Sequence, residues 1–108
     1  MPIQEISEET FEPLIQSQSI VIMDFWAEWC VPCKTFALIF AKVAEAYPQL
    51  SFASVNIETA TALAEDLSIC SVPHIMIFKK GIAVYSESGS HPESTLRELI
   101  GQALVLEL

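Results

Sequence analysis

Residues 25–34 have the sequence FWAEWCVPCK, in which two cysteines three positions apart separate an apolar run from an amphipathic segment. The preceding run, residues 20–26, is almost continuously apolar, as is typical of a strand buried on both faces. After Pro32, apolar residues recur at three- and four-residue spacing, which predicts a helix. Cys30 and Cys33 are therefore expected at the junction of a strand and a helix.

This junction favours redox chemistry at the thiol pair. Cys30 falls near the unsatisfied N–H groups at the positive end of the predicted helix, where a thiolate is stabilised. The thiolate is the nucleophile of disulfide exchange, so Cys30 is the expected attacking thiol. Pro32 suits the first helical turn and keeps the two sulfurs within disulfide reach, while Lys34 adds a positive charge nearby.

The cysteine pair is also compatible with a core-packing role and with a metal-binding role. Small buried hydrophobic residues would account for two cysteines, although the flanking Trp29 and Pro32 are unusual for a plain core segment. A zinc site would need two further ligands, taken from Cys70, His74 and His91. No second cysteine pair has the spacing of a zinc knuckle, and we expect no metal.

Composition limits the protein class. The 108 residues suit one domain spanning 1–108, and 52% hydrophobic against 18% charged residues argues against disorder. The net charge of −9 makes nucleic acid an implausible partner. Residues 1–11 lack a secretory pattern, and no apolar run reaches the length of a membrane span. Three cysteines are too few for a secreted disulfide framework, so we expect a soluble, cytoplasmic protein without membrane partners.

Periodicity predicts an α/β fold. We expect strands at residues 3–6, 20–26, 50–57, 75–78 and 82–85, and helices at residues 7–17, 32–47, 59–67 and 92–104. Helices separate the first three strands, which should therefore be parallel, whereas residues 79–81 predict a hairpin turn between the last two. The result is a central mixed five-stranded sheet with four helices on its two faces. Pro13 fits the first helix only if the helix begins later or bends there.

The segment DFWAEWCVPCK, residues 24–34, resembles the active-site segment of the thioredoxin family, whose usual form has glycine at the position of Val31. The resemblance covers nearly the whole chain. Val72-Pro73 is similar to the family's Ile-Pro with a cis peptide bond, and Gly89 is similar to a late glycine beside the active site. Residues 78–81 are similar to a strand and turn of the family.

This resemblance implies a thioredoxin fold and the activity of a protein-disulfide reductase. Cys30 would attack a client disulfide and Cys33 would resolve the mixed disulfide. The redox-active disulfide itself would replace any cofactor, and a thioredoxin reductase or similar donor would return the electrons. The resemblance also implies that the protein is a monomer and takes part in electron transport and cell redox homeostasis.

Asp24 is the most informative residue outside the cysteines. A carboxylate within an apolar strand should have a raised pKa, which suits a proton acceptor for the resolving thiol. The matching aspartate of the family has this proposed role. The alternative is an acid at a strand edge that faces water.

The family also implies a client groove beside the disulfide. Pro73 would be cis and pack against the disulfide, while the backbone of Val72 would pair with a client strand. The expected rim of the groove comprises Trp29, Ile57, Ser71, Val72, Pro73 and Gly89. Trp26 is assigned to the core.

Several positions depart from the family pattern. Val31 stiffens the loop between the cysteines. Leu38 replaces a kinking proline, and Ser54 replaces a lysine near the buried aspartate, so Asp24 should lack a cationic partner. His74 follows Pro73 where threonine is common; it would tune the thiolate or form a hydrogen bond at a strand end.

Cys70 and His91 complete the set of candidates. Cys70 would be a regulatory third thiol or a buried inert cysteine, and we favour the buried one. His91 is expected on the surface at a helix start.

Two functions remain for the whole chain. The first is thiol-disulfide exchange through Cys30 and Cys33, which the intact cysteines and Asp24 favour. The second is a thioredoxin-like binding or chaperone-type module, or a more oxidising or isomerase-like relative, that uses the same groove.

Overall fold

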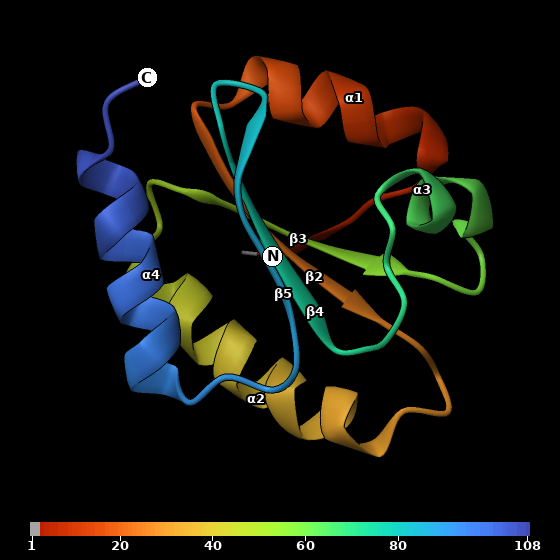
Figure 1. Cartoon of the computed structure of the whole chain (residues 1–108). Helices are drawn as coiled ribbons and strands as arrows, with labels where there is room; N and C mark the ends of the chain where they lie inside the picture. Colours follow the sequence, from red (N-terminus) through yellow and green to blue (C-terminus); the bar gives the residue numbers. More distant parts are fainter. Residues whose placement is uncertain (1–2) are drawn as a thin grey trace.

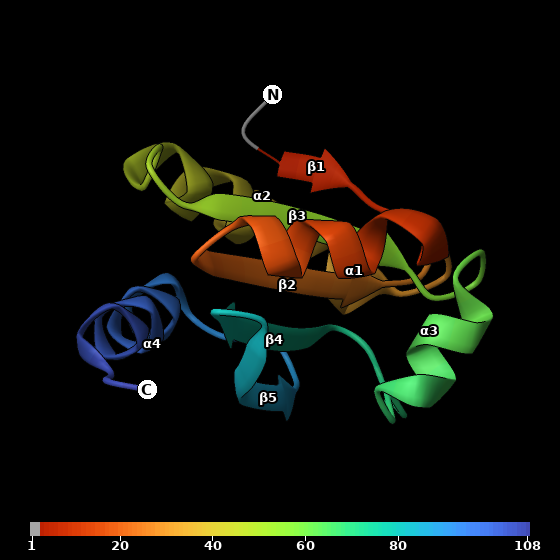
Figure 2. The ribbon, with the colours of Figure 1, turned by 90° about the horizontal axis from the view of Figure 1, so that it is seen from above.

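The computed structural model describes residues 3–108, so the first two residues of the predicted domain lie outside it. In this range the chain forms five strands and four helices. In chain order they are β1 (Ile3–Glu5), α1 (Glu8–Ser17), β2 (Ile20–Trp26), α2 (Val31–Ala46), β3 (Ser51–Asn56), α3 (Thr61–Asp66), β4 (His74–Lys79), β5 (Ile82–Ser88) and α4 (Glu93–Val105). The strands form one sheet in the order β1-β3-β2-β4-β5, visible in Figure 2. The predicted mixed sheet flanked by helices is confirmed.

β2 lies in the middle of this sheet, and its first six residues are buried, which confirms the predicted strand buried on both faces. It runs parallel to β3, with Met23 opposite Ala53, and antiparallel to β4, with Met23 opposite Met76. β1 pairs with β3 in parallel, and β5 pairs with β4 in antiparallel. The parallel first three strands and the antiparallel final pair are both confirmed.

Two helices cover each face of the sheet. α1 and α3 lie on one side, and α2 and α4 lie on the other (Figure 1). Because side chains alternate along β2, Ile22 belongs to the core cluster on the α2 side and Phe25 to the cluster on the α1 side. Asp24 shares the face of Ile22 and therefore points toward α2.

The last hairpin differs in detail from the prediction. Lys79 belongs to β4, and the turn consists of Lys80 and Gly81, whose φ angles are +53° and +79°. Two positive φ angles are the geometry of a type I′ hairpin. Lys79 lies outside the turn because it pairs with Ile20 of β2 and Ile82 of β5. Its ammonium group donates hydrogen bonds to the carbonyls of Ala103 and Leu104 at the end of α4.

Two predicted boundaries were also wrong. β5 continues to Ser88, because its polar last residues still pair with β4 at the sheet edge, where no apolar side chains are required. α3 covers only Thr61–Asp66, after a turn that follows β3. α1 begins at Glu8 and continues through Pro13, so the helix does not begin later.

α3 receives its N-terminal cap from another helix. Its own N-cap residue, Ala60, offers no side-chain acceptor. Glu8 of α1 instead accepts hydrogen bonds from the N–H groups of Ala62 and Leu63, at 2.7 and 3.1 Å. None of the helices within residues 3–108 is long and apolar enough to cross a membrane.

Candidate redox site

Cys30 and Cys33 form a disulfide at the start of α2. Cys30 is the N-cap residue of the helix, and its sulfur accepts a hydrogen bond from the N–H of Cys33 at 3.2 Å. Both cysteines are almost fully enclosed, with 3% and 2% of their surface exposed. The predicted strand-to-helix junction is thus confirmed, and one N-terminal amide of α2, that of Cys33, contacts the sulfur of Cys30.

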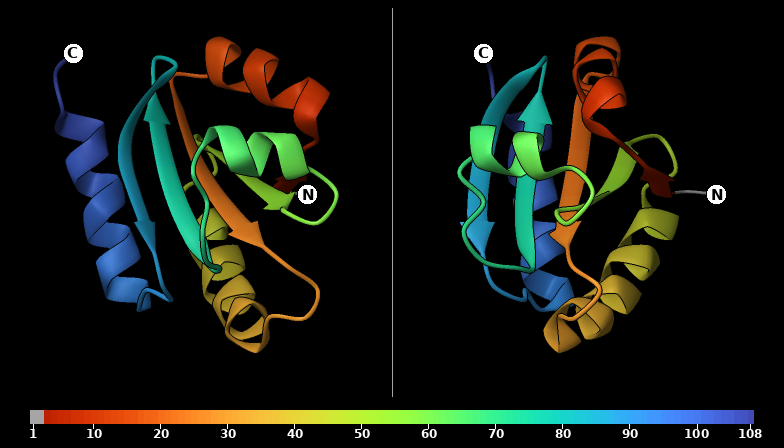
Figure 3. Two further views of the ribbon diagram at one scale, coloured as in Figure 1. Left: turned by 45° about the vertical axis from the view of Figure 1, so that its right-hand side comes forward. Right: turned by 90° about the vertical axis from the view of Figure 1, so that its right-hand side faces the viewer.

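The loop before β4 runs toward the end of the sheet where α2 begins (Figure 3). The peptide bond between Val72 and Pro73 is cis, as the resemblance implied. The carbonyl oxygen of Val72 lies 3.7 Å from the sulfur of Cys30. The carbonyl oxygen of Pro73 accepts a hydrogen bond from the N–H of Gly89 at 2.7 Å, which brings the predicted glycine beside the predicted proline.

An apolar cluster surrounds the two sulfurs. Cys30 and Cys33 pack with Ala27, and the half-buried Ile57 and Val72 contact this cluster. Trp26, which we assigned to the core, is only partly buried and also packs here.

The remaining rim residues are more exposed. Trp29 precedes Cys30 with 67% of its surface exposed, and Ser71 and Gly89 are exposed as well. Val31 and Pro32, between the two cysteines, also face outward. An apolar surface therefore adjoins the buried disulfide.

Asp24 is buried beneath α2. Only 3% of its surface is exposed, and its Oδ1 atom has no hydrogen-bond partner among residues 3–108. Burial raises the pKa of Asp24 from 3.8 to about 8, because the charged form loses its hydration. The alternative of a carboxylate at a strand edge facing water is wrong, since Asp24 sits in the central strand.

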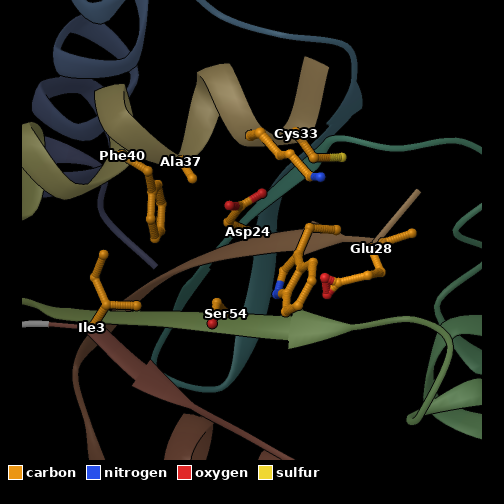
Figure 4. A pocket seen from close by; sticks show the side chains of 10 residues that line it. Ile3, Asp24, Glu28, Cys33, Ala37, Phe40 and Ser54 are labelled. Carbon is orange, nitrogen blue, oxygen red and sulfur yellow. The ribbon is translucent and has the colours of Figure 1, made fainter. Parts of the chain in front are cut away.

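A cavity of about 310 Å³ connects Asp24 with Cys33. Figure 4 shows the Asp24 carboxyl group beneath α2, between Ala37 and Cys33, with Ser54 on the neighbouring strand. Ser54 is the residue directly opposite Asp24 in β3. The cavity is lined by Ile3, Asp24, Trp26, Ala27, Glu28, Cys33, Lys34, Ala37, Phe40 and Ser54.

Known proteins are similar to this chain in sequence and in fold. The protein-family model described as Thioredoxin matches residues 2–102. The chain belongs to the thioredoxin family. A Streptomyces coelicolor protein whose name places it among the thioredoxins is 40% identical over 104 residues, which cover 96% of this chain and 78% of its own.

Two further thioredoxins are similar to this chain, one in sequence and one in structure. The thioredoxin of Mycoplasma pneumoniae is 39% identical over 82% of this chain and 87% of its own. The crystal structure of thioredoxin f from spinach chloroplast superposes with a TM-score of 0.87 at 30% identity, over 94% of this chain and 93% of its own. The predicted thioredoxin fold is confirmed. Family membership and the Cys30–Cys33 disulfide identify a thiol-disulfide oxidoreductase of the protein-disulfide reductase type.

His74, a departure from the usual thioredoxin pattern, is buried at the start of β4. Its Nε2 atom lies 2.8 Å from the hydroxyl of Ser86, and its ring packs edge-on against Phe25. Burial lowers the pKa of His74 below 6.5, and the raising effect of Glu87 is smaller. A lowered pKa keeps the ring uncharged at neutral pH, which favours the hydrogen-bonding role over electrostatic tuning of the thiolate.

Two sequence-based assignments in this thioredoxin-family site were wrong. Cys70 is exposed, not buried, because it lies in the loop after α3, where its thiol donates only a weak hydrogen bond to the carbonyl of Ser68. His91 is buried, with 8% of its surface exposed, because its ring lies against Tyr85 of β5 and Phe36 of α2. No local sequence pattern signals this contact, which depends on how the loop after Gly89 turns.

Residues 3–108 bring together no group of three or more His, Cys, Asp or Glu side chains that could hold a metal ion. Cys70, His74 and His91, the candidate ligands for a zinc site, have other surroundings. His74 contacts Ser86, His91 contacts Tyr85, and Cys70 faces solvent. The two cysteines of the motif are joined to each other.

Replacing Gly89 by alanine should destabilise the protein by about 1 to 3 kcal/mol, the cost of backbone strain at a disfavoured φ. Gly89 has φ +111°, and an added Cβ would meet no atom within 4 Å, so strain rather than a clash sets the effect. Gly101→Ala is the matched control, because Gly101 lies inside α4 with open space around it. This control should gain up to about 1 kcal/mol. Urea unfolding measures the stability of both variants. A Gly89→Ala protein as stable as the wild type would contradict the expectation.

Proposed function

We propose that Cys30 attacks disulfides of client proteins and that Cys33 completes their reduction. The Cys30 thiolate bonds to one client sulfur, and the other client sulfur leaves as a thiolate. Cys33 then loses its proton and attacks the sulfur of Cys30, which releases the second client sulfur. The client gains two electrons, and the Cys30–Cys33 disulfide forms.

The position of Cys30 is the observation that carries this assignment of roles. Its sulfur is the one that receives a backbone N–H at the start of α2 and lies beside the carbonyl of Val72. A thiolate at Cys30 is therefore stabilised by the helix N-terminus. Cys33 lies within the first turn, on the side of the cavity that contains Asp24.

Asp24 supports the proposal as the group that exchanges a proton with Cys33. With a pKa of about 8, it is mostly protonated at neutral pH yet ionises within reach of physiological pH. Its ionised form accepts the Cys33 proton during client reduction. In the reverse step, when a reductase opens the Cys30–Cys33 disulfide, the protonated form donates to the leaving Cys33 sulfur.

We place the client along the wall formed by Val72, Pro73 and Gly89. A client strand would pair with the backbone of Val72, while Trp29, Ile57 and Ser71 complete the surface. The half-buried apolar side chains of Ile57 and Val72 beside the sulfurs support this placement. Val31 and Lys34 lie next to it on α2 and would modulate the exchange.

We propose the partners and the compartment of a protein that reduces disulfides in other proteins. Members of this family act on disulfide-containing substrates and receive electrons from reductases. We expect a thioredoxin reductase as the donor and a monomeric single domain in the reducing cytoplasm. The cysteine content supports the reducing compartment, and the acidic net charge argues against nucleic acid as a partner.

A trapping experiment tests the order of attack. Cys33→Ser should accumulate a mixed disulfide between Cys30 and a protein client, because the second step is blocked. Mass spectrometry of the non-reduced product identifies the cysteine involved. A mixed disulfide at Cys70, or none in Cys33→Ser, would contradict the mechanism. Client binding without any turnover of the wild type would favour the binding-module alternative.

A further inference from the structure

A series of three hydrogen bonds runs from the predicted client wall through His91 to Tyr85. The N–H of Gly89 donates to the carbonyl of Pro73 at 2.7 Å. The Nδ1 atom of His91 lies 3.0 Å from the carbonyl of Gly89, and its Nε2 atom lies 2.9 Å from the hydroxyl of Tyr85. A carbonyl oxygen only accepts, so Nδ1 carries the proton, and in the neutral ring Nε2 accepts from Tyr85.

His91 is enclosed between α2 and β5. Only 8% of its surface is exposed. Its ring lies 6.3 Å from that of Phe36 on α2 and 6.0 Å from that of Tyr85 on β5, measured between centroids. Phe36 follows Cys33 by three residues, so His91 joins the active-site helix to the segment that contains Gly89. Both ring nitrogens have partners, which removes the penalty for burying them.

We propose that His91 is a positioning residue for client binding. Its Nδ1–H group fixes the Gly89 carbonyl, and the N–H of the same glycine holds the Pro73 carbonyl next to the cis bond. The wall that receives the client is then already ordered before the client arrives, which lowers the entropic cost of binding. The inference rests on the proposed function, in which clients lie along Val72, Pro73 and Gly89.

Matched substitutions at His91 distinguish the effect of its hydrogen bond to Gly89 from the effect of its ring packing. The amide group of asparagine reaches the position of Nδ1, whereas that of glutamine reaches the position of Nε2. His91→Asn therefore keeps the donor to Gly89, and His91→Gln and His91→Leu lose it. The loss of one hydrogen bond predicts a KM for a protein disulfide that rises about five-fold in His91→Gln and His91→Leu.

His91→Asn should stay within about two-fold of the wild-type KM. In all three variants kcat should be unchanged, as should the rate with a small aromatic disulfide that does not contact the wall. Steady-state kinetics with both substrates and a thioredoxin reductase as donor provide these values, because dithiothreitol would reduce the small aromatic disulfide directly. Urea unfolding records the stability of each variant. A loss of packing alone would alter stability but would not give His91→Asn and His91→Gln different KM values.

The outcomes that contradict each proposal are distinguishable. Equal KM values in all three variants and wild type, or the same rise in all three, would overturn the role of the Nδ1–H group. If His91→Leu does not fold, the comparison between His91→Asn and His91→Gln decides. A wild type that reduces the small disulfide but not the protein disulfide would overturn the client-binding proposal, and this inference with it.

Discussion

Cys30→Ser is expected to reduce the rate of protein-disulfide reduction to that of dithiothreitol alone. A serine hydroxyl does not ionise near neutral pH, so the helix N-terminus of α2 has no anion to stabilise. Cys33 cannot replace it, because only the sulfur of Cys30 accepts a backbone N–H at the start of α2 and lies beside the carbonyl of Val72. Turnover with dithiothreitol or a thioredoxin reductase as donor measures the loss.

The third cysteine supplies the control for this experiment. Cys70 is exposed in the loop after α3 and is not part of the disulfide. Cys70→Ser should therefore retain the wild-type rate. Activity that survives Cys30→Ser but disappears in Cys70→Ser would refute the assignment of Cys30 as the nucleophile.

Asp24→Asn should make the protein slower and more stable at the same time. The variant cannot exchange a proton with Cys33, and the rate should fall by roughly 100-fold, the lower end of the contribution of general acid–base catalysis. Stability should rise at neutral pH, because a neutral amide avoids the cost of a carboxyl group that would ionise in the unfolded chain but not in the folded one.

The pH dependence follows from the direction of the pKa shift. The folded pKa of Asp24 is about 8 and the ordinary value is 3.8, so the folded state binds more protons between these values. The stability of the wild type should therefore fall as pH rises from about 4 to 8, and level off above. At pH 7 the difference from Asp24→Asn is of the order of 4 kcal/mol, at about 1.4 kcal/mol per pKa unit.

Urea unfolding at a series of pH values measures this difference. In Asp24→Asn the stability should not fall between about pH 4 and 8 as it does in the wild type. A variant that keeps the wild-type rate and loses stability would contradict both parts of the expectation.

Ser54→Lys should lower the raised pKa of Asp24. Residue 54 lies opposite Asp24 in β3 and lines the same cavity. A lysine there would place a positive charge near the carboxylate and should lower its pKa by at least about one unit. The pH range in which stability declines should then shift downward. An unshifted range would show that the added ammonium group does not reach Asp24.

The sequence predicted most of this fold because its signals are local. The apolar run of β2 and the periodicity of α2 each occur within a few residues, and both were confirmed. The CxxC motif likewise lies on one short segment. The edge strand β5 was less predictable, since a strand at the sheet edge can end in polar residues such as Glu87.

The parts of the site that the sequence did not predict depend on contacts between distant segments. The buried state of His91 arises from Tyr85 and Phe36, which lie on different elements. Lys79 was assigned to a turn because its partners, the carbonyls at the end of α4, are more than twenty residues away. Neither contact leaves a periodic pattern in the chain.

The cap on α3 has a consequence for motion near the site. A helix of six residues is too short to be stable alone, and Glu8 holds its first amides from another helix. Local opening of α3 should therefore require less free energy than global unfolding, and its amides should exchange with solvent faster than those of β2. The loop after α3 leads directly to Val72 and Pro73, so the client wall is anchored by His91 on one side and adjoins a readily opening segment on the other.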